Sequence, residues 1–293
     1  MPTVLLSDRG VIEVAGPDAA DFLNRLLTNQ VPEKSAQKEP VAQDSARLAS
    51  HAALLTPQGK VLASFMIVRH PHQEDGFLLD CARSCLAESL KRFTLYKLRA
   101  ACTVKDVSDL WHVHAVWPST QPPTAKIEDS VAFDDPRHAE MGMRILSRHR
   151  LASEHDPSDY DNRRIGFGLA EDGKDFASSD VFPHEINLDH TYGLDFHKGC
   201  YVGQEVVSRM HHRGTARNRM VVVDFAGGNP PAAGSEIKSG ALLMGHLGSV
   251  GTQGTGLALL RIDRVQEALA KAQELTVNDM RLIPHLPDWI TPS

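Results

Sequence analysis

The chain has 293 residues, of which 42% are hydrophobic and 23% are charged, and its formal net charge is −6. This balance is typical of globular domains and excludes a mostly disordered chain, a coiled coil or a collagen-like fibre. Because the net charge is negative, the protein as a whole does not attract nucleic acid, and an anionic partner would have to bind a local basic patch.

Nothing in the sequence indicates a membrane-bound or exported protein. The longest apolar run, residues 61–68, is far shorter than the ~20 residues of a membrane-spanning helix. The first residues run into a strand-like segment and show neither a secretory signal nor an Arg- and Ser-rich transit peptide. The four cysteines, Cys81, Cys85, Cys102 and Cys200, fit free thiols in a reducing compartment better than a disulfide framework. A cytoplasmic location is therefore expected.

In chain order, the first half of the sequence mixes helical and strand patterns. A helix is expected after Asp18, where apolar residues recur at helical spacing, and a second helix through Phe93. Strands are expected over residues 48–55, 61–68, 76–81, 100–107 and 111–117. Such a mixture without a strict βαβ rhythm predicts an α+β fold.

The character of the sequence changes after residue 219, where short strand-like segments alternate with close-set glycines. This pattern is typical of a small β-barrel. We therefore expect two domains, residues 1–217 and residues 218–293. Two polar, proline-bearing stretches, residues 32–43 and 119–130, are expected to be surface loops.

The densest cluster of chemistry-bearing residues reads Lys-Gly-Cys-Tyr-Val-Gly-Gln-Glu over residues 198–205. Glycines stand one residue before and three residues after Cys200, which permits positive φ angles and a close approach to a ligand. Lys198 and the start of a helix just after Cys200 would both favour the thiolate of Cys200. On spacing alone, a lone cysteine is more often a small buried hydrophobe, and that interpretation stays open at this point.

Residues 198–205, with Arg209 and Arg213-Gly214 after them, resemble the KGCYxGQE signature of the YgfZ-type folate-binding proteins, relatives of the T-protein of the glycine cleavage system. The resemblance extends through residues 16–31, 55–62, 92–107 and 182–188 and into the glycine-rich C-terminal part. It implies an α+β, T-protein-like folate-binding region around a central cavity, with a small C-terminal β-barrel. It also implies a tetrahydrofolate-binding accessory protein that supports assembly or repair of iron-sulfur clusters, including those of tRNA-modifying enzymes.

The resemblance implies roles for individual residues. Glu185 matches the pterin-anchoring glutamate of T-proteins, because a carboxylate can accept two hydrogen bonds from the donor face of a pterin; a solvated surface acid is the alternative. Cys200 is the candidate catalytic thiol, tuned by Lys198, and Gln204 and Glu205 would fix the loop at the helix start. The candidate cofactor-binding residues are Glu185, Asn187, Lys198, Tyr201, Gln204, Glu205, Arg209 and Arg213, and no metal site is expected.

Residues 208–219 concentrate arginine and histidine and contain no acid. This segment could receive the glutamate tail of folate through guanidinium contacts, contact RNA phosphates, or simply form a solvated basic face. A contact with tRNA, if one exists, is expected to be indirect. The expected partners are folate and iron-sulfur assembly proteins or cluster-containing enzymes.

One departure from the T-proteins bears on mechanism. T-proteins carry acidic residues in the strand after the first turn, where an aspartate assists one-carbon transfer, whereas residues 56–67 of this chain contain no Asp or Glu. The missing carboxylate weighs against the alternative function, a folate-dependent one-carbon (aminomethyl or methyl) transferase. Whether the protein turns over a substrate, and as what oligomer it works, stay open.

Overall fold

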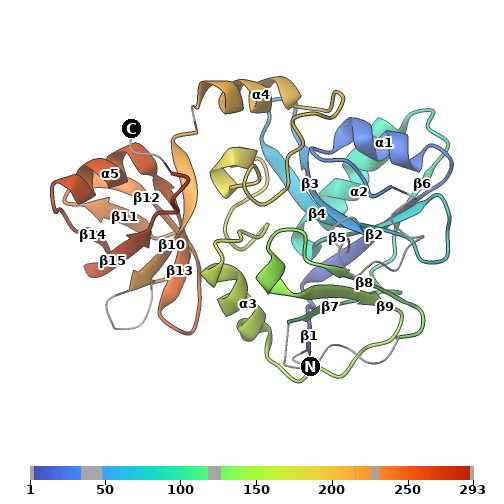
Figure 1. The fold of residues 1–293 in the computed structure, drawn as a ribbon, viewed down its shortest axis with the longest axis horizontal. Helices are drawn as coiled ribbons and strands as arrows, with labels where there is room; N and C mark the ends of the chain where they lie inside the picture. Colours follow the sequence, from blue (N-terminus) through green and yellow to red (C-terminus); the bar gives the residue numbers. More distant parts are fainter. Residues whose placement is uncertain (1–2, 34–47, 118–126, 215, 226–230, 291–293) are drawn as a thin grey trace.

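The computed structural model describes residues 3–33, 48–117, 127–214, 216–225 and 231–290. Two open β-sheets form one body of this part of the chain, and a closed β-barrel lies beside it (Figure 1). The barrel is at the left of the view, and helix α4 (Gln204–Arg213) runs along the top of the molecule. No described helix is both long and apolar enough to cross a membrane.

The larger open sheet has five antiparallel strands in the order β3-β4-β5-β2-β6. These strands are β2 (Arg9–Ala15), β3 (Ala49–Leu55), β4 (Val61–Arg69), β5 (Gly76–Ala82) and β6 (Thr103–Asp106). Helices α1 (Ala19–Leu26) and α2 (Arg83–Lys97) pack on one face of the sheet, where the rings of Phe22 and Phe65 both contact Phe93. The apolar residues at helical spacing along α1 therefore cover the sheet, as amphipathic patterning predicts.

The second sheet has four antiparallel strands in the order β1-β7-β9-β8. These strands are β1 (Thr3–Leu5), β7 (His112–Val116), β8 (Ser130–Asp134) and β9 (Met143–Ser147). Side chains of this sheet, such as Phe133 and Leu146, share a core with Val68 and Leu78 of the larger sheet. Because β4 and β5 are covered on both faces, they read in the sequence as nearly continuous apolar runs rather than as alternating strands.

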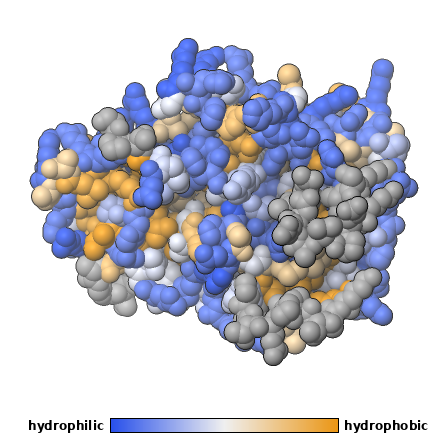
Figure 2. Space-filling view, viewed as in Figure 1, coloured by the Kyte–Doolittle hydropathy of each residue, from blue (hydrophilic) through white to orange (hydrophobic). Residues whose placement is uncertain are grey.

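The C-terminal strands close into a barrel in the order β10-β13-β12-β11-β14-β15. These strands are β10 (Asn218–Phe225), β11 (Glu236–Ser239), β12 (Leu242–Val250), β13 (Thr255–Arg261), β14 (Leu275–Val277) and β15 (Met280–His285), with helix α5 (Ile262–Ala270) after β13. Figure 2 shows apolar side chains gathered over the barrel on the face that it draws. Leu242, Leu269 and Ile283 are among the exposed large hydrophobic residues of the described chain.

A long segment with few regular elements joins the second sheet to the barrel. It contains helix α3 (Pro157–Gly166), the short 3₁₀ helix η4 (Pro183–Ile186) and helix α4, whereas a second 3₁₀ helix, η3 (Ala139–Met141), lies between β8 and β9. Helix α3 is not among the elements expected above, although Asp156 caps its first turn and Pro157 starts it, both typical signals of a helix start. This segment also supplies acidic residues to a set of buried ion pairs, such as Arg164 with Asp175 at 2.6 Å.

The α+β fold with a C-terminal barrel is confirmed, and the expected strands and helices of the first half are present within a few residues of the expected ends. The loops expected at residues 32–43 and 119–130 lie mostly outside the described residues. The division of the chain into residues 1–217 and 218–293 stays a prediction about folding units.

Candidate functional site

The thiol of Cys200 differs from the other thiols of the protein. All four cysteines lie in the described part of the chain, and only Cys200 is exposed. Burial raises the pKa of Cys85 to about 11 and raises the pKa of Cys81 further. Cys200 is therefore the thiol that a partner molecule can reach.

Lys198 anchors the loop that carries Cys200. Its ammonium group donates to the backbone oxygens of Leu27, at 2.7 Å, and Asn29, at 3.0 Å, just after α1. Burial lowers the pKa of Lys198 to about 8, and the ammonium lies 5.5 Å from the centre of the buried Tyr201 ring. These contacts hold both residues inside the protein, so the tuning of Cys200 by Lys198 stays a prediction.

The two glycines that flank Cys200 have different uses. Gly203 has a φ of 84°, and a Cβ atom there would lie 2.8 Å from the carbonyl oxygen of Thr56. The facing turn also needs a glycine, because a Cβ on Gly59 would lie 2.9 Å from Cβ of Val206. Gly199, in contrast, has open space around it. Gly203 thus serves the packing of the loop on the β3–β4 turn, and only Gly199 leaves room beside the thiol.

We expect Gly203→Ala to destabilise the protein much more than Gly199→Ala. In Gly203→Ala the new Cβ atom would clash with the backbone at a residue that has a left-handed conformation, which lowers the free energy of unfolding by about 1–3 kcal/mol. In Gly199→Ala the new Cβ atom has no other atom within 4 Å. For a chain of this size, we expect the melting temperature of Gly203→Ala to fall by about 5 °C or more. Thermal unfolding of both variants followed by circular dichroism checks this, and equal melting temperatures would contradict it.

Helix α4 begins inside the motif, at Gln204, and presents charged groups to solvent. Glu205 pairs with Arg209 at 2.6 Å, four residues later, and Gln204 starts the helix without a side-chain cap. Arg213 is exposed in the last turn. Further along, Arg219 is paired with Asp189, at 2.7 Å. The basic segment expected over residues 208–219 is therefore partly neutralised by acids from outside it.

Glu185 and Asn187 join η4 to the first barrel strand. The carboxylate of Glu185 accepts from the backbone N–H of Phe182, at 2.7 Å, through one oxygen and from the side chain of Asn218, at 2.8 Å, through the other. The side-chain amide of Asn187 donates to the carbonyl of Met220 at 2.8 Å. Both oxygens of Glu185 are thus used within the protein. Each oxygen keeps one lone pair for a further donor, so the bidentate pterin anchor expected at Glu185 stays a prediction.

Two cavities have His51, a residue of the edge strand β3, in their walls. The larger one, which we call the Tyr192 cavity, has a volume of about 470 Å³ and includes Asn29, Ser50, Asp135 and Tyr192 in its wall. The smaller one, which we call the Ser64 chamber, has a volume of about 10 Å³ and is lined by residues that include His51, Ser64 and Arg137. The Tyr192 cavity is large enough for a small organic ligand, and the Ser64 chamber for one water or amino group.

The wall of the Tyr192 cavity is built by residues that sequence patterns did not single out. Asn29 donates through its side-chain amide to the carbonyls of His51, at 3.1 Å, and Tyr192, at 2.8 Å, and so ties β3 to the Tyr192 loop. Tyr192 is 73% exposed and has a φ of 54°, so its ring stands at the surface. Burial lowers the pKa of His51 to about 4. At neutral pH the cavity therefore has an uncharged imidazole in its wall.

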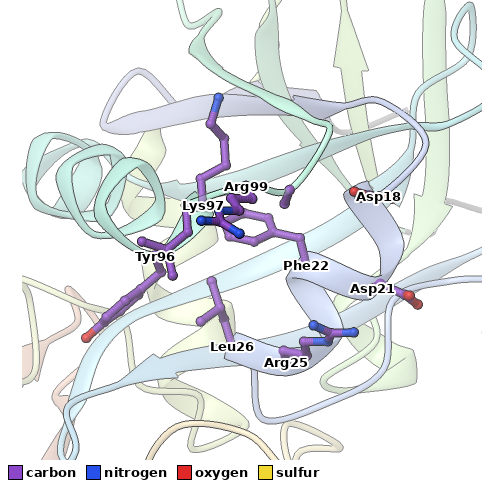
Figure 3. Close-up of a pocket in the computed structure, with 10 residues that line it drawn as sticks. Asp18, Asp21, Phe22, Arg25, Leu26, Tyr96, Lys97 and Arg99 are labelled. Atoms are coloured by element: carbon purple, nitrogen blue, oxygen red, sulfur yellow. The ribbon is translucent and has the colours of Figure 1, made fainter.

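A further cavity, of about 770 Å³, is a groove between α1 and the end of α2 (Figure 3). Phe22 and Leu26 form an apolar floor, with Arg25, Lys97 and Arg99 around it. None of the site residues expected from the sequence lines this groove. Among the described residues, no group of three or more His, Cys, Asp or Glu is placed to hold a metal ion.

Comparison with known proteins adds family relationships to this geometry. A family model described as "CAF17, C-terminal beta-barrel domain" matches residues 217–292. The iron-sulfur cluster assembly factor IBA57 of Mus musculus is 34% identical, and that of Homo sapiens 32% identical, each over 97% of this chain and 84% of the relative. The IBA57 homologue of Mycosarcoma maydis is 36% identical over 77% of this chain, which spans 58% of that longer relative.

Among solved structures, the glycine cleavage system aminomethyltransferase T of Bartonella henselae matches 98% of this chain and 86% of its own, with a TM-score of 0.69 and 15% identity. This likeness confirms the T-protein-like fold expected from the sequence. At such low identity it shows the fold alone.

The expected cytoplasmic location is wrong by these comparisons. The relatives from Mycosarcoma maydis, Mus musculus and Homo sapiens are all named as mitochondrial proteins. The expectation rested on composition and on the first residues of the chain. An address segment is separate from the folded domain, so the composition of the domain does not report location.

Proposed function

Because the chain belongs to the IBA57 family of iron-sulfur cluster assembly factors, we propose that it supports iron-sulfur cluster assembly through an exposed thiol and a separate folate cavity. The observation that carries this proposal is the presentation of Cys200. The thiol is exposed, while Lys198 and Tyr201 on either side of it are buried. A rigidly held, exposed thiol suits contact with a metal cluster or a partner thiol.

The proposed role of Cys200 is to act together with a partner protein. Iron-sulfur clusters are held by several cysteine thiolates, and this loop offers one. The other ligands of a cluster would therefore come from the partner. In the alternative chemistry, the Cys200 thiolate attacks a partner disulfide, which forms a mixed disulfide and releases the second partner sulfur as a thiolate.

We place tetrahydrofolate in the Tyr192 cavity. Its volume of about 470 Å³ suits a pterin ring, and the exposed Tyr192 ring offers a stacking surface. The side-chain amide of Asn29 donates to the carbonyl of Tyr192 at 2.8 Å and so fixes the backbone there. The residues expected to bind folate from the motif, such as Tyr201 and Gln204, do not line this cavity. We propose that Tyr201 supports the Cys200 loop, because its buried ring lies 5.5 Å from the ammonium group of Lys198.

Two further proposals concern the enzymes that the protein serves and the division of the chain into domains. The likeness of residues 198–205 to the YgfZ signature supports clients that include tRNA-modifying enzymes. The pairing of Arg209 with Glu205 and of Arg219 with Asp189 disfavours direct binding of RNA, because these guanidinium groups are already neutralised. We keep residues 218–293 as the proposed second domain, which contains the whole barrel.

Genetic complementation tests the proposed function. The wild-type chain is expressed in cells that lack their own family member, and the activities of iron-sulfur enzymes are measured in extracts beside an enzyme without a cluster. We expect the iron-sulfur activities to recover and the control activity to stay constant. A chain that is produced in folded form and restores none of the iron-sulfur activities would refute the proposal.

A one-carbon transferase remains the second candidate because of one contact. Strand β4 itself has no acid, but Asp172 reaches it from another segment and accepts hydrogen bonds from the backbone N–H, at 3.2 Å, and the hydroxyl of Ser64. The argument from a missing carboxylate is therefore weaker in three dimensions than in the sequence. Production of methylene-tetrahydrofolate from amine donors by the purified protein would support this candidate, and its absence across the donors would exclude it for them.

A further inference from the structure

The groove between α1 and the end of α2, which we call the α1–α2 groove, is built on the core of the larger sheet (Figure 3). Phe22 and Leu26 of α1 form its floor and are only 6% and 7% exposed. Both belong to the apolar cluster under α1 and α2, so packing fixes their positions. The volume of about 770 Å³ is enough for several side chains of another molecule. The groove therefore offers a rigid apolar floor with room above it.

Leu98 lines the same groove and ends α2 in a costly conformation. Its φ is 46°, a left-handed value at which helices usually place glycine, and its side chain is 85% exposed. A leucine in this region is strained, and an apolar side chain in solvent gains nothing from the fold in return. Residues kept in such conformations cluster at binding sites. Leu98 thus indicates a contact with another molecule.

The charges that line the α1–α2 groove differ in sign from the charge of the whole protein. Three cations line it: Arg25, Lys97 and Arg99. None of the three forms an ion pair with an acid in the part of the chain that the structure describes. Two acids, Asp18 and Asp21, also line it, and Asp18 already accepts from the backbone N–H of Ala101 at 2.7 Å. Because the chain has a net charge of −6, the groove is a local excess of positive charge on an acidic protein.

This combination favours an acidic segment of a protein as the occupant. The apolar floor and Leu98 suit apolar side chains, and the unpaired guanidinium groups of Arg25 and Arg99 suit carboxylates, whose planar shape they match. A membrane or a nucleic acid presents a dense array of phosphates, which the carboxylates of Asp18 and Asp21 would repel. A peptide segment can place its few carboxylates away from these acids.

The α1–α2 groove adjoins the loop of Cys200 through helix α1. Leu26 lines the groove, and the carbonyl of Leu27, the next residue, accepts from the ammonium group of Lys198 at 2.7 Å. Val202, on the other side of Cys200 in the motif, packs against the apolar cluster that includes Leu26. A molecule held in the groove would therefore lie next to the loop that presents the thiol.

We propose that the α1–α2 groove binds an acidic, partly apolar segment of the protein that acts together with Cys200. This inference rests on the proposed function, in which a partner supplies the other cluster ligands or the disulfide. Apolar side chains of the segment contact Phe22 and Leu98, and its carboxylates pair with Arg25 and Arg99. The groove supplies affinity for the partner, and the thiol supplies the chemistry.

The test uses two fluorescent synthetic peptides and the full-length protein. The acidic peptide has leucine at helical spacing and glutamate at the other positions, and its counterpart has lysine in place of glutamate. By fluorescence anisotropy, we expect the wild-type protein to bind the acidic peptide at least about tenfold more tightly than the basic one, and less tightly as salt is added. Without the groove, a protein of net charge −6 would favour the basic peptide. Equal binding, or a preference for the basic peptide, would overturn the inference.

Charge reversal locates the binding. In the double variant Arg25→Glu, Arg99→Glu we expect the preference for the acidic peptide to disappear, because carboxylates then face carboxylates. The matched control combines Arg83→Glu with Lys91→Glu, which makes the same change of net charge at exposed positions of α2 outside the groove lining. The control should keep the preference. A tenfold preference that survives in the folded double variant at positions 25 and 99 would contradict the inference.

Leu98→Gly separates binding from folding. Glycine removes the apolar side chain and adopts a positive φ without strain, so we expect a melting temperature close to that of the wild type. The affinity for the acidic peptide should fall about tenfold, because a leucine contact is lost. A leucine that served only the fold would give the opposite result, a lower melting temperature with unchanged affinity, and that result would also overturn the inference.

The outcomes separate this inference from the proposed function. Vesicles that contain phosphatidylglycerol replace the peptide in a further titration, and binding to vesicles without binding to the acidic peptide would make the groove a membrane surface and refute the inference. If the wild-type chain restores iron-sulfur enzymes but binds both peptides equally, the proposed function stands and the groove inference fails. If the chain restores none of them but keeps its preference for the acidic peptide, the proposed function fails and the site for an acidic segment stands.

Discussion

Replacing Cys200 by serine is expected to lower the restored iron-sulfur enzyme activity at least about tenfold, toward the level of cells without the protein. The serine hydroxyl has nearly the same size but does not ionise at neutral pH and is a poor ligand for iron in a cluster. Because Cys200 is exposed and no described residue forms a hydrogen bond with it, the substitution should leave the fold and the melting temperature unchanged. Complementation and thermal unfolding together check both halves of this expectation.

A control variant separates loss of the thiol from damage to the loop. His197 is exposed three residues before Cys200, so His197→Ser changes the same surface without touching the thiol. We expect this control to restore activity to nearly the wild-type level. Full restoration by Cys200→Ser would show that the thiol has no role in the assembly of clusters.

The largest effect on stability is expected for Arg164→Met. The side chain of Arg164 is completely buried and pairs with Asp175 and Asp161, both at 2.6 Å. It also donates to the hydroxyl of Ser249 in barrel strand β12, at 2.7 Å, and so joins α3 to the barrel. Methionine leaves the buried Asp175 without its cation, which costs about 3–5 kcal/mol, whereas Asp161 keeps its contact with Lys174 at 3.0 Å. We expect the melting temperature to fall by about 10 °C or more.

The adjacent residue gives a matched control for this substitution. Arg163 donates to the carbonyl of Glu140 and pairs with no acid among the described residues, so Arg163→Met should cost no more than about 1 kcal/mol. Chemical denaturation of both variants gives the two free energies of unfolding. Similar losses at positions 163 and 164 would mean that the buried pairs do not stabilise the protein.

Much of the fold could be predicted from local patterns. Strands β3 to β5 are apolar runs bounded by turn residues, and α1 has apolar residues at helical spacing, so both signals lie within a few adjacent positions. The motif around Cys200 is also local, and its resemblance to a family signature indicated the T-protein-like fold and an iron-sulfur role. Only the exposure of Cys200 needed the structure.

The parts that could not be predicted depend on contacts between distant residues. Asp80 meets Arg9 and Arg144 across separations of 71 and 64 residues, and no spacing pattern reports such pairs. The contacts of Glu185 could not be predicted either, because its carboxylate accepts a hydrogen bond from Asn218, 33 residues later in the chain. The carboxyl missing from β4 is supplied by Asp172, 108 residues after Ser64. In each case the sequence shows the type of side chain but not the distant residue that it contacts.

Calorimetric titration of tetrahydrofolate tests the central claim, a folate cavity that is separate from the working thiol. We expect the wild-type protein to bind, Cys200→Ala to bind equally well, and Tyr192→Ala to bind about tenfold more weakly because a stacking ring is lost from the cavity wall. Absence of binding by the folded wild-type protein, or loss of binding in Cys200→Ala with full binding in Tyr192→Ala, would contradict the account.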